Sequence, residues 1–325
     1  MGLLDRLLRR RAPAEPPPAA PPPARAPVAP PPPPPPPAPR EPIAAPAPPR
    51  PAPPPPPSAP EAPAPPPPPP VPVGPPPVPE PAVGALFLGT YAVERARSPD
   101  AWDGRAPDGK PVLIQRLAAT SDRVALGTLD HPSLARVHDG AATEGGWIAV
   151  IEVVEGIGLD ERLAKGGMQV REAAPIMLSA LAGLGHLHEH HLLHGHLQPG
   201  VIRLTGTGRA KLTGFGAVRP AASVEEGLCL APEQLEGAPG DARSDLYAAA
   251  ATFYQLLSGR HYLGETPPDL AELRRRVRDV PPRLPVGGQP GAISAWLGKG
   301  LAKNPAERFQ SAGEMAKALQ RAIAR

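Results

Sequence analysis

Residues 191–204 read HLLHGHLQPGVIRL and join a predicted long helix to a predicted small hairpin. Upstream, apolar side chains in Ala173–Leu187 recur with the 3.6-residue period of a helix, which we expect to end near His190. Downstream, Val201–Leu204 and Ala210–Thr213 flank glycines and predict two short paired strands. The stretch is therefore a loop, and its histidines raise the question of which chemistry it supports.

The segments before this loop are predicted to be mainly strands, and those after it mainly helices. Four short strands are predicted, at Tyr91–Glu94, Pro111–Leu117, Leu134–Asp139 and Trp147–Val153. From Asp245 onward the pattern is helical, with breaks at prolines. A strand-rich part followed by a helix-rich part predicts an α+β domain of two lobes.

The first 84 residues have a different composition. The chain contains 57 prolines in 325 residues, against a usual share of about 5%, and most of them precede residue 83. Proline removes the backbone donors that helices and sheets need. We expect Ala12–Val83 to be disordered with a polyproline II bias, and place the linker at 12–84.

Residues 1–11 are basic and amphipathic. Four arginines there outweigh Asp5 by three charges, which equals the formal net charge of the whole chain, +3. The remainder is neutral, so the composition does not indicate a nucleic-acid partner. Leu3, Leu4, Leu7 and Leu8 share one helical face, which favours a membrane surface or a partner's groove. The alternative is a solubilising start with accidental periodicity.

The single cysteine, Cys229, excludes an intramolecular disulfide and favours a reducing compartment. No run of about 18 apolar residues predicts a spanning helix, and residues 1–11 do not match a secretory signal. We therefore expect a cytoplasmic protein, with peripheral contact at the inner face of the membrane through residues 1–11 as a further hypothesis.

Seven stretches follow one another in a definite order along the rest of the chain. They read DHPSLARVHDG, IAVIEVVEG, HLLHGHLQP, KLTGFG, LAPEQLEG, RSDLYAAAATFYQLLSG and NPAERFQSAGEM. In this order they resemble segments of the eukaryotic-type Ser/Thr protein kinases of bacteria, including the H-R-D catalytic loop, D-F-G and A-P-E. The resemblance implies a bilobal kinase-like domain at 85–325, with a small antiparallel β lobe at 85–155 and a larger helical lobe at 156–325.

At the positions where this family performs phosphoryl transfer, the resemblance aligns residues that lack the required charge. Gln115 stands at the strand lysine, His196 at the catalytic aspartate and Gln198 at the loop lysine. Val201 and Gly214 stand where an asparagine and an aspartate hold Mg²⁺, which prefers oxygen ligands. No catalytic residue is intact, and no metal or other cofactor is expected.

The nucleotide pocket is also expected to be altered. By resemblance it would be lined by Leu113, Gln115, Ile151 and Val153. Leu113 replaces a small alanine that lies over the adenine ring. The turn at Arg95–Gly104 has no glycine before its end, where the family has a glycine-rich loop, and Asp122 stands at the glutamate that pairs with the strand lysine.

The residues that hold the family's fold together are present. By resemblance, His194 and Phe215 belong to a hydrophobic column between the lobes, and Asp245 accepts hydrogen bonds from the catalytic-loop backbone. Glu233 and Arg308 match a buried ion pair of the helical lobe. Residues that maintain the family's fold are present, and residues that perform phosphoryl transfer are absent, which is the pattern of a pseudokinase.

Other readings of the same residues remain open. His186 and His190 have the i, i+4 spacing of a helical zinc site, although that segment of the family is rich in histidine. Lys110 and Arg116 lie on the strand face opposite Gln115, so alternation argues against their replacing the lysine. We expect a catalytically inactive module that scaffolds an unidentified protein partner in signalling. The alternative is a weakly active Ser/Thr kinase, or an ATP sensor without phosphoryl transfer, using ATP and Mg²⁺.

Overall fold

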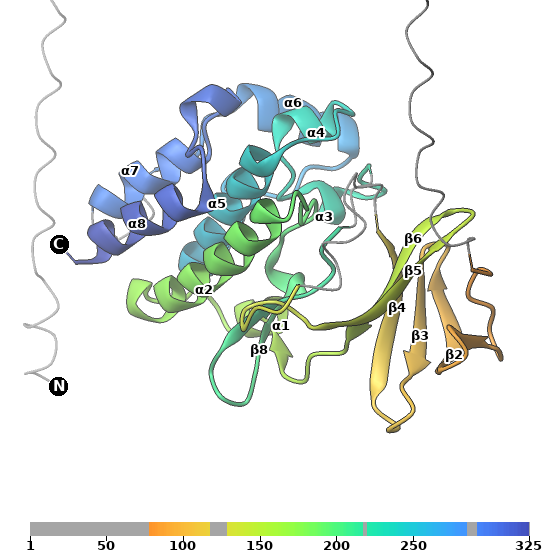
Figure 1. Ribbon diagram of the computed structural model, residues 1–325. Helices are drawn as coiled ribbons and strands as arrows, with labels where there is room; N and C mark the ends of the chain where they lie inside the picture. The colour runs from red at the N-terminus through yellow and green to blue at the C-terminus, as the bar shows by residue number, and fades with distance from the viewer. Residues whose placement is uncertain (1–77, 118–128, 217–219, 285–290, 325) are drawn as a thin grey trace, which may run out of the picture. The chain divides into compact units, whose positions relative to one another are not determined.

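The computed structural model describes residues 78–117, 129–216, 220–284 and 291–324. The predicted basic segment 1–11, the predicted linker up to residue 77 and Asp122 lie outside these residues. Within them the chain forms an antiparallel sheet followed by a larger body of helices, as the yellow-to-blue colouring of Figure 1 shows. This is the predicted α+β architecture of two lobes.

The sheet of the first lobe has six strands in the order β1-β2-β3-β4-β6-β5, all antiparallel to their neighbours. They are β1 (Leu86–Phe87), β2 (Tyr91–Ser98), β3 (Ala101–Arg105), β4 (Pro111–Leu117), β5 (Val137–Thr143) and β6 (Gly146–Glu152). The bounds of β4 are those predicted. β2 continues to Ser98, beyond the predicted end at Glu94, and β5 begins three residues later than predicted.

The two faces of this sheet pack into different cores. On β6, Ile148 and Val150 are buried in a small core that also contains Trp102. Ala149 and Ile151, which alternate with them, join the main core of the protein. The sheet therefore contributes side chains to two cores, one within its own lobe and one shared with the helical lobe.

The residues just before β1 correct the predicted linker boundary. The backbone N–H of Val78 donates to Ala142 O of β5 at 2.8 Å, and Pro81 is buried. Glu80 pairs with Arg116 of β4 at 2.8 Å. Although Val78–Gly84 has the composition of the linker, these contacts hold it against the sheet, so the folded part includes residues before 85.

The helical lobe contains a small sheet, α-helices and short 3-10 turns. The sheet is β7 (Ile157–Gly158), β8 (Ile202–Leu204) and β9 (Ala210–Leu212), and β8–β9 is the predicted hairpin. The helices are α1 (Leu159–Leu163), α2 (Val170–Glu189), α3 (Val224–Gly227), α4 (Pro232–Leu235), α5 (Ala242–Ser258), α6 (Leu270–Asp279), α7 (Gly291–Gly300) and α8 (Ala312–Ile323), with 3-10 turns η2 (Pro199–Val201) and η3 (Pro305–Glu307). None of the helices in the described part of the chain is long and apolar enough to cross a membrane.

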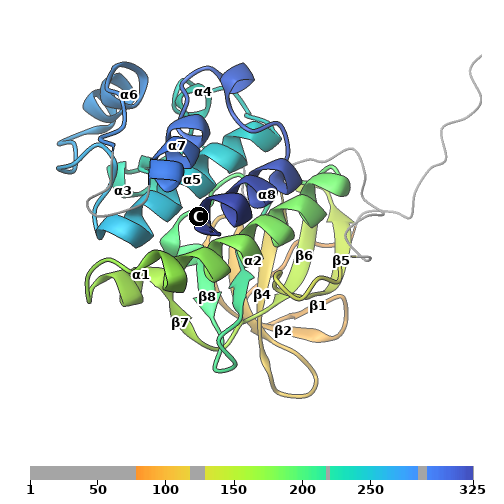
Figure 2. The ribbon, with the colours of Figure 1, turned by 90° about the vertical axis from the view of Figure 1, so that its left-hand side faces the viewer.

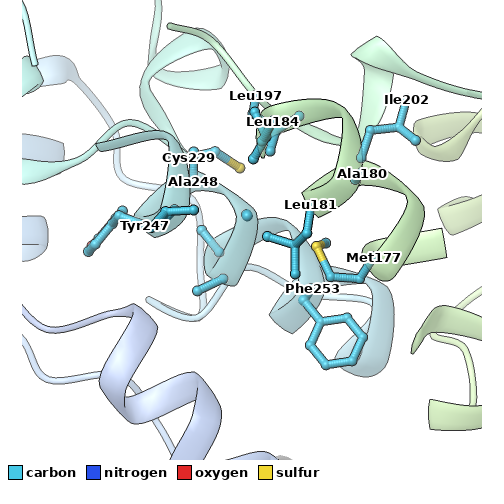
Figure 3. Close-up of a cluster of buried hydrophobic side chains, with 14 of the residues drawn as sticks. Met177, Ala180, Leu181, Leu184, Leu197, Ile202, Cys229, Tyr247, Ala248 and Phe253 are labelled. Carbon is cyan, nitrogen blue, oxygen red and sulfur yellow. The ribbon is translucent and has the colours of Figure 1, made fainter. Parts of the chain in front are cut away.

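Helix α5 lies at the centre of this lobe and packs against α2 and α7, while α8 packs against α2 and α7 (Figure 2). Nearly every side chain of α5 after its first turn is buried, which is the pattern of a helix surrounded by other elements. Met177 and Leu181 of α2 gather with Phe253 of α5 in the main core (Figure 3). This core fixes the position of α2, from which the loop 191–201 emerges.

The two lobes are joined by direct contacts. Leu212 of β9 exchanges backbone hydrogen bonds with the segment before β5, donating to Ser133 O and accepting from Ala135 N, both at 2.8 Å. Lys211 of β9 pairs with Glu152 at the end of β6. The contacts of Leu212 and Lys211 therefore join the helical lobe, which contains the loop 191–201, to the first lobe.

Candidate functional site

The loop between α2 and η2 is held through its backbone by one buried carboxylate. Asp245, on α5 and 2% exposed, accepts from His194 N at 2.9 Å and from Gly195 N at 2.8 Å. The Nε2 atom of His188 lies 2.9 Å from the same carboxylate. This is the contact that the resemblance implies for Asp245, and it fixes the course of the loop.

Both histidines in the centre of the loop are buried. His194 is fully buried, and burial lowers the pKa of its imidazole to about 4, so it is neutral at neutral pH. His196 is 8% exposed, and its backbone N–H donates to Nδ1 of His194 at 3.4 Å. The position aligned with the catalytic aspartate therefore carries an imidazole that is packed inside the protein.

The two positions that the resemblance aligns with the family's metal ligands, Val201 and Gly214, lie close together and offer no oxygen ligand from their side chains. Thr213 donates to the Val201 carbonyl through both its N–H, at 2.9 Å, and its Oγ1, at 3.0 Å. A Cβ on Gly214 would lie 3.6 Å from Cγ1 of Val201. Val201 and Gly214 are close enough to share an ion, but Val201 presents methyl groups and Gly214 only a hydrogen.

Three of the four residues predicted to line a nucleotide pocket share one face of the sheet. Leu113 of β4 is paired with Ile151 of β6, and Gln115 follows on the same face, buried. Val153 lies beyond the end of β6 and is 43% exposed. The face next to the loop is therefore neutral where a strand lysine would stand.

The cations considered as substitutes for that lysine are engaged elsewhere. Arg116 contacts Glu80 and Asp100 at 2.8 and 2.9 Å, on the opposite side of β4 from Gln115. Lys110 pairs with Asp108 in the exposed turn between β3 and β4. The predicted alternation accounts for Arg116, whereas Lys110 lies in the turn before β4 begins at Pro111.

The predicted turn at Arg95–Gly104 is a tight hairpin. β2 and β3 are joined by only Pro99 and Asp100, and Ser98 pairs with Ala101. Two cations of the hairpin, Arg95 and Arg97, both pair with Asp103. A connection of two residues, one of them proline, leaves few free N–H groups to surround a phosphate.

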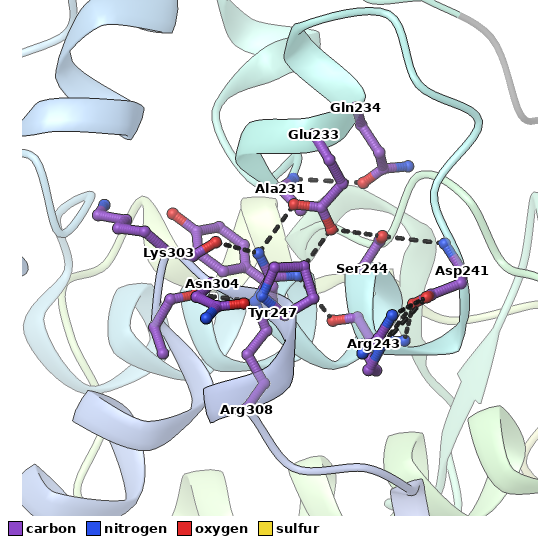
Figure 4. Close-up of polar contacts among 12 residues, drawn as sticks. Ala231, Glu233, Gln234, Asp241, Arg243, Ser244, Tyr247, Lys303, Asn304 and Arg308 are labelled. Atoms are coloured by element: carbon purple, nitrogen blue, oxygen red, sulfur yellow. Dashed lines mark hydrogen bonds and ion pairs between the residues drawn. The ribbon is translucent and has the colours of Figure 1, made fainter. Parts of the chain in front are cut away.

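The ion pair predicted for the helical lobe, Glu233 with Arg308, is present (Figure 4). The Arg308 guanidinium donates to Glu233 through Nη1 at 2.7 Å and Nη2 at 2.8 Å, and Ser244 Oγ donates to Glu233 at 2.6 Å. Burial alone would raise the pKa of Glu233, but the hydrogen bonds from Arg308 and Ser244 outweigh it and hold that pKa below its usual value. Phe215 is buried in the main core.

The histidines suggested as a zinc site form a stack instead. The ring centroids of His186 and His190 are 4.5 Å apart, and His131, which the sequence did not single out, stacks on His186 at 5.1 Å. Within the described ranges no group of three or more His, Cys, Asp or Glu side chains is arranged to hold a metal ion. The zinc hypothesis has no support there.

A cavity of about 370 Å³ below the loop was not predicted from the sequence. Its lining includes Gln198, Gly200, Asp160, Cys229, Gln255 and Arg260. Burial raises the pKa of the Cys229 thiol to about 12, so the thiol stays protonated and is a poor nucleophile. The cavity offers polar contacts without an activated group.

Comparison with known proteins gives consistent similarities. Residues 115–284 match the family described as protein kinase domain. The chain is 33% identical over 215 residues to a probable serine/threonine-protein kinase of Corynebacterium efficiens, and 32% identical over 203 residues to the serine/threonine-protein kinase PknB of Mycobacterium leprae. These alignments cover 60% and 58% of this chain and 33% of each relative, so the chain spans about a third of the length of the curated relatives it matches.

The buried ion pair predicts a large stability difference between two arginine substitutions. Arg308→Met leaves the Glu233 carboxylate without its partner, and we expect a loss of about 3 kcal/mol in the free energy of unfolding. The estimate is at the low end for a buried pair because the Glu233 side chain is 22% exposed. Arg278→Met removes an exposed pair with Asp279 and should leave the urea midpoint unchanged. Equal midpoints for the two variants would contradict the role of Arg308.

Two buried histidines predict loss of stability in mild acid. Burial lowers the pKa of both His194 and His261 to about 4, below the usual value of about 6.5. The unfolded chain therefore binds more protons between these pH values, and the free energy of unfolding should fall as pH is lowered through that window, by up to about 3 kcal/mol per histidine.

Urea unfolding at pH 7.5, 5.5 and 4.5 measures this dependence. His261→Asn should make it shallower, whereas His191→Asn, which changes an exposed histidine, should leave it unaltered. A pH-independent unfolding free energy in the unmodified protein would refute the assignment.

Proposed function

The chain belongs to the protein kinase domain family, and we propose that its domain is a pseudokinase, which binds protein partners without transferring phosphate. The observation that carries the proposal is the pair Val201 and Gly214. Their backbones lie side by side as a metal site requires, yet neither side chain offers an oxygen to Mg²⁺. Phosphoryl transfer depends on that ion to neutralise charge on the phosphates.

Three further features support loss of transfer. Gln115 brings no positive charge to the sheet face beside the loop, and His196 is buried. The two-residue connection between β2 and β3 contains proline in place of a glycine-rich cradle. Each weakens a different part of the reaction, namely phosphate binding, substrate orientation and phosphate enclosure.

The binding role is supported by what remains. Asp245 and the Glu233–Arg308 pair maintain the loop and the helical lobe in the absence of catalytic charges. A stable surface on a long proline-rich tether suits a scaffold, since a tether raises the effective concentration of whatever the two ends bind. At about 3.1 Å per residue in polyproline II, the predicted linker reaches on the order of 200 Å when extended.

A second candidate, a weakly active Ser/Thr kinase or an ATP sensor, is favoured by the relatives. The proteins matched in Corynebacterium and Mycobacterium are named as serine/threonine-protein kinases. A histidine can also act as a general base, and His196 occupies the relevant position of the loop. This candidate requires binding of ATP with Mg²⁺, which separates it from the pseudokinase.

Thermal unfolding with ATP tests the two candidates. For the unmodified full chain we expect no shift in Tm at millimolar ATP, with or without Mg²⁺. The variant Leu113→Ala, Val201→Asn, Gly214→Asp reopens the pocket and restores both metal ligands, and aspartate tolerates the positive φ of 68° at residue 214. We expect this variant to gain a Mg²⁺-dependent shift that grows with ATP concentration.

The control is Leu113→Ala, Val201→Asn alone, which lacks the carboxylate and should show no Mg²⁺ dependence. A Mg²⁺-dependent shift in the unmodified chain, together with phosphate transfer that His196→Ala abolishes, would overturn the pseudokinase proposal and establish the kinase. A Mg²⁺-dependent shift without transfer would instead establish the ATP sensor.

We also propose that residues 1–11 bring the tether to a membrane surface. Four leucines on one helical face followed by arginines suit an anionic interface. The full chain should float with anionic lipid vesicles and remain behind with neutral phosphatidylcholine vesicles, whereas a chain lacking residues 1–11 should remain behind with both. Equal flotation of the two chains would remove the membrane from the proposal.

A further inference from the structure

The segment that enters the sheet from the proline-rich side is held at several points, including Gly84, whose N–H donates to Val93 O of β2 at 2.8 Å. We call Val78–Gly84 the anchor. Its Val78 forms a parallel bridge with Thr143 and donates to Ala142 O at 2.8 Å, on the outer edge of β5. Its Glu80 accepts from Gly145 N at 3.0 Å in the turn between β5 and β6. The anchor therefore contacts the β5–β6 hairpin through backbone and side chain.

The anchor also contacts the guanidinium of Arg116, which it shares with another segment. Nη2 of Arg116 donates to Glu80 at 2.8 Å, and Nε donates to Asp100 at 2.9 Å. Nη1 lies 3.3 Å from Thr143 Oγ1. One side chain on β4 thus joins the anchor, the β5–β6 hairpin and the connection between β2 and β3.

The sequence around this junction leaves room for it. A Cβ on Gly145 would lie 2.5 Å from Nη1 of Arg116 and 2.7 Å from Oε1 of Glu80. A side chain there would have to displace one of the two charged groups. Glycine at residue 145 therefore leaves the space in which Glu80 and Arg116 form their ion pair.

The other partner, Asp100, lies at the tip of the hairpin β2–β3. Its carbonyl also accepts from Arg116 N at 2.8 Å, which extends the β3–β4 ladder beyond the pair Ala101 and Gln115. The tip is thus held beside Gln115, at the position where a glycine-rich loop would meet a nucleotide. Arginine suits this role because its planar fork presents several N–H donors in fixed directions, whereas lysine presents one compact ammonium group.

We propose that Arg116 is a latch that couples the anchor Val78–Gly84 to the tip of the β2–β3 hairpin. Detachment of the anchor, by tension on the proline-rich segment or by a partner that captures it, removes one of the two carboxylates and frees the tip beside Gln115. Such a coupling is reciprocal by thermodynamic necessity, so freeing the tip also loosens the anchor. The latch does not depend on whether the domain binds nucleotide.

Hydrogen–deuterium exchange on the full chain measures both ends of the latch. The amide of Arg116 reports on the tip, through its bond to Asp100 O, and the amide of Val78 reports on the anchor, through its bond to Ala142 O. Glu80→Gln should speed exchange at Val78 and, several-fold, at Arg116. Asp100→Asn should speed exchange at Val78 although residue 100 does not contact it, and Arg116→Lys should reproduce both effects.

Asp108→Ala is the matched control, because it also deletes a carboxylate paired with a cation on this sheet, at the opposite end of β4. It should leave the amides of Val78 and Arg116 unchanged. The latch is overturned if Glu80→Gln speeds exchange at Val78 while Arg116 stays within twofold of the unmodified chain, or if Asp108→Ala speeds both amides equally. Unchanged exchange in α2 and α5 shows that each variant keeps its fold.

Discussion

The carboxylate of Asp245 is the interaction on which the loop and the candidate site depend. It lies inside the helical lobe on α5, and the donors it receives come from the loop backbone at His194 and Gly195. A buried carboxylate that loses its donors is costly, so the backbone must stay where the donors reach it. This constraint acts on N–H groups, and it leaves the side chains at His196 and Gln198 free to differ without altering the course of the loop.

Charge is retained in this domain where the protein itself supplies the partner. Arg308 is fully buried and forms both hydrogen bonds of its fork with Glu233. At residue 214 a carboxylate would receive no positive charge from the neighbouring Val201, whose side chain is neutral. Glycine at residue 214 and valine at residue 201 bring no charge to this position, so they need no counter-charge there.

The sequence predicted the features that local pattern or motif order determines, such as β4, the β8–β9 hairpin and the proximity of Val201 to Gly214. It missed those that depend on distant partners. The strand character of Arg95–Ser98 comes from pairing with β3, since the segment has no apolar alternation of its own. Val78–Gly84 has the composition of a linker, and it is held by distant partners, among them Ala142 and Arg116. The cavity beside Gln198 is lined by segments that are far apart in the sequence, so no local pattern predicts it.

The two lobes are joined by contacts between residues of the chain itself. The backbone exchange at Leu212 and the pair Lys211–Glu152 cross from one lobe to the other without using any position assigned to nucleotide or metal. Leu117 at the end of β4 packs so closely on Gly216 that a Cβ there would lie 2.9 Å from its Cδ2. The sheet has its own small core on one face and contributes Leu117, Ala149 and Ile151 to the main core on the other. The contacts at Leu212, Lys211 and Leu117 therefore hold the sheet against the helical lobe through the chain's own residues.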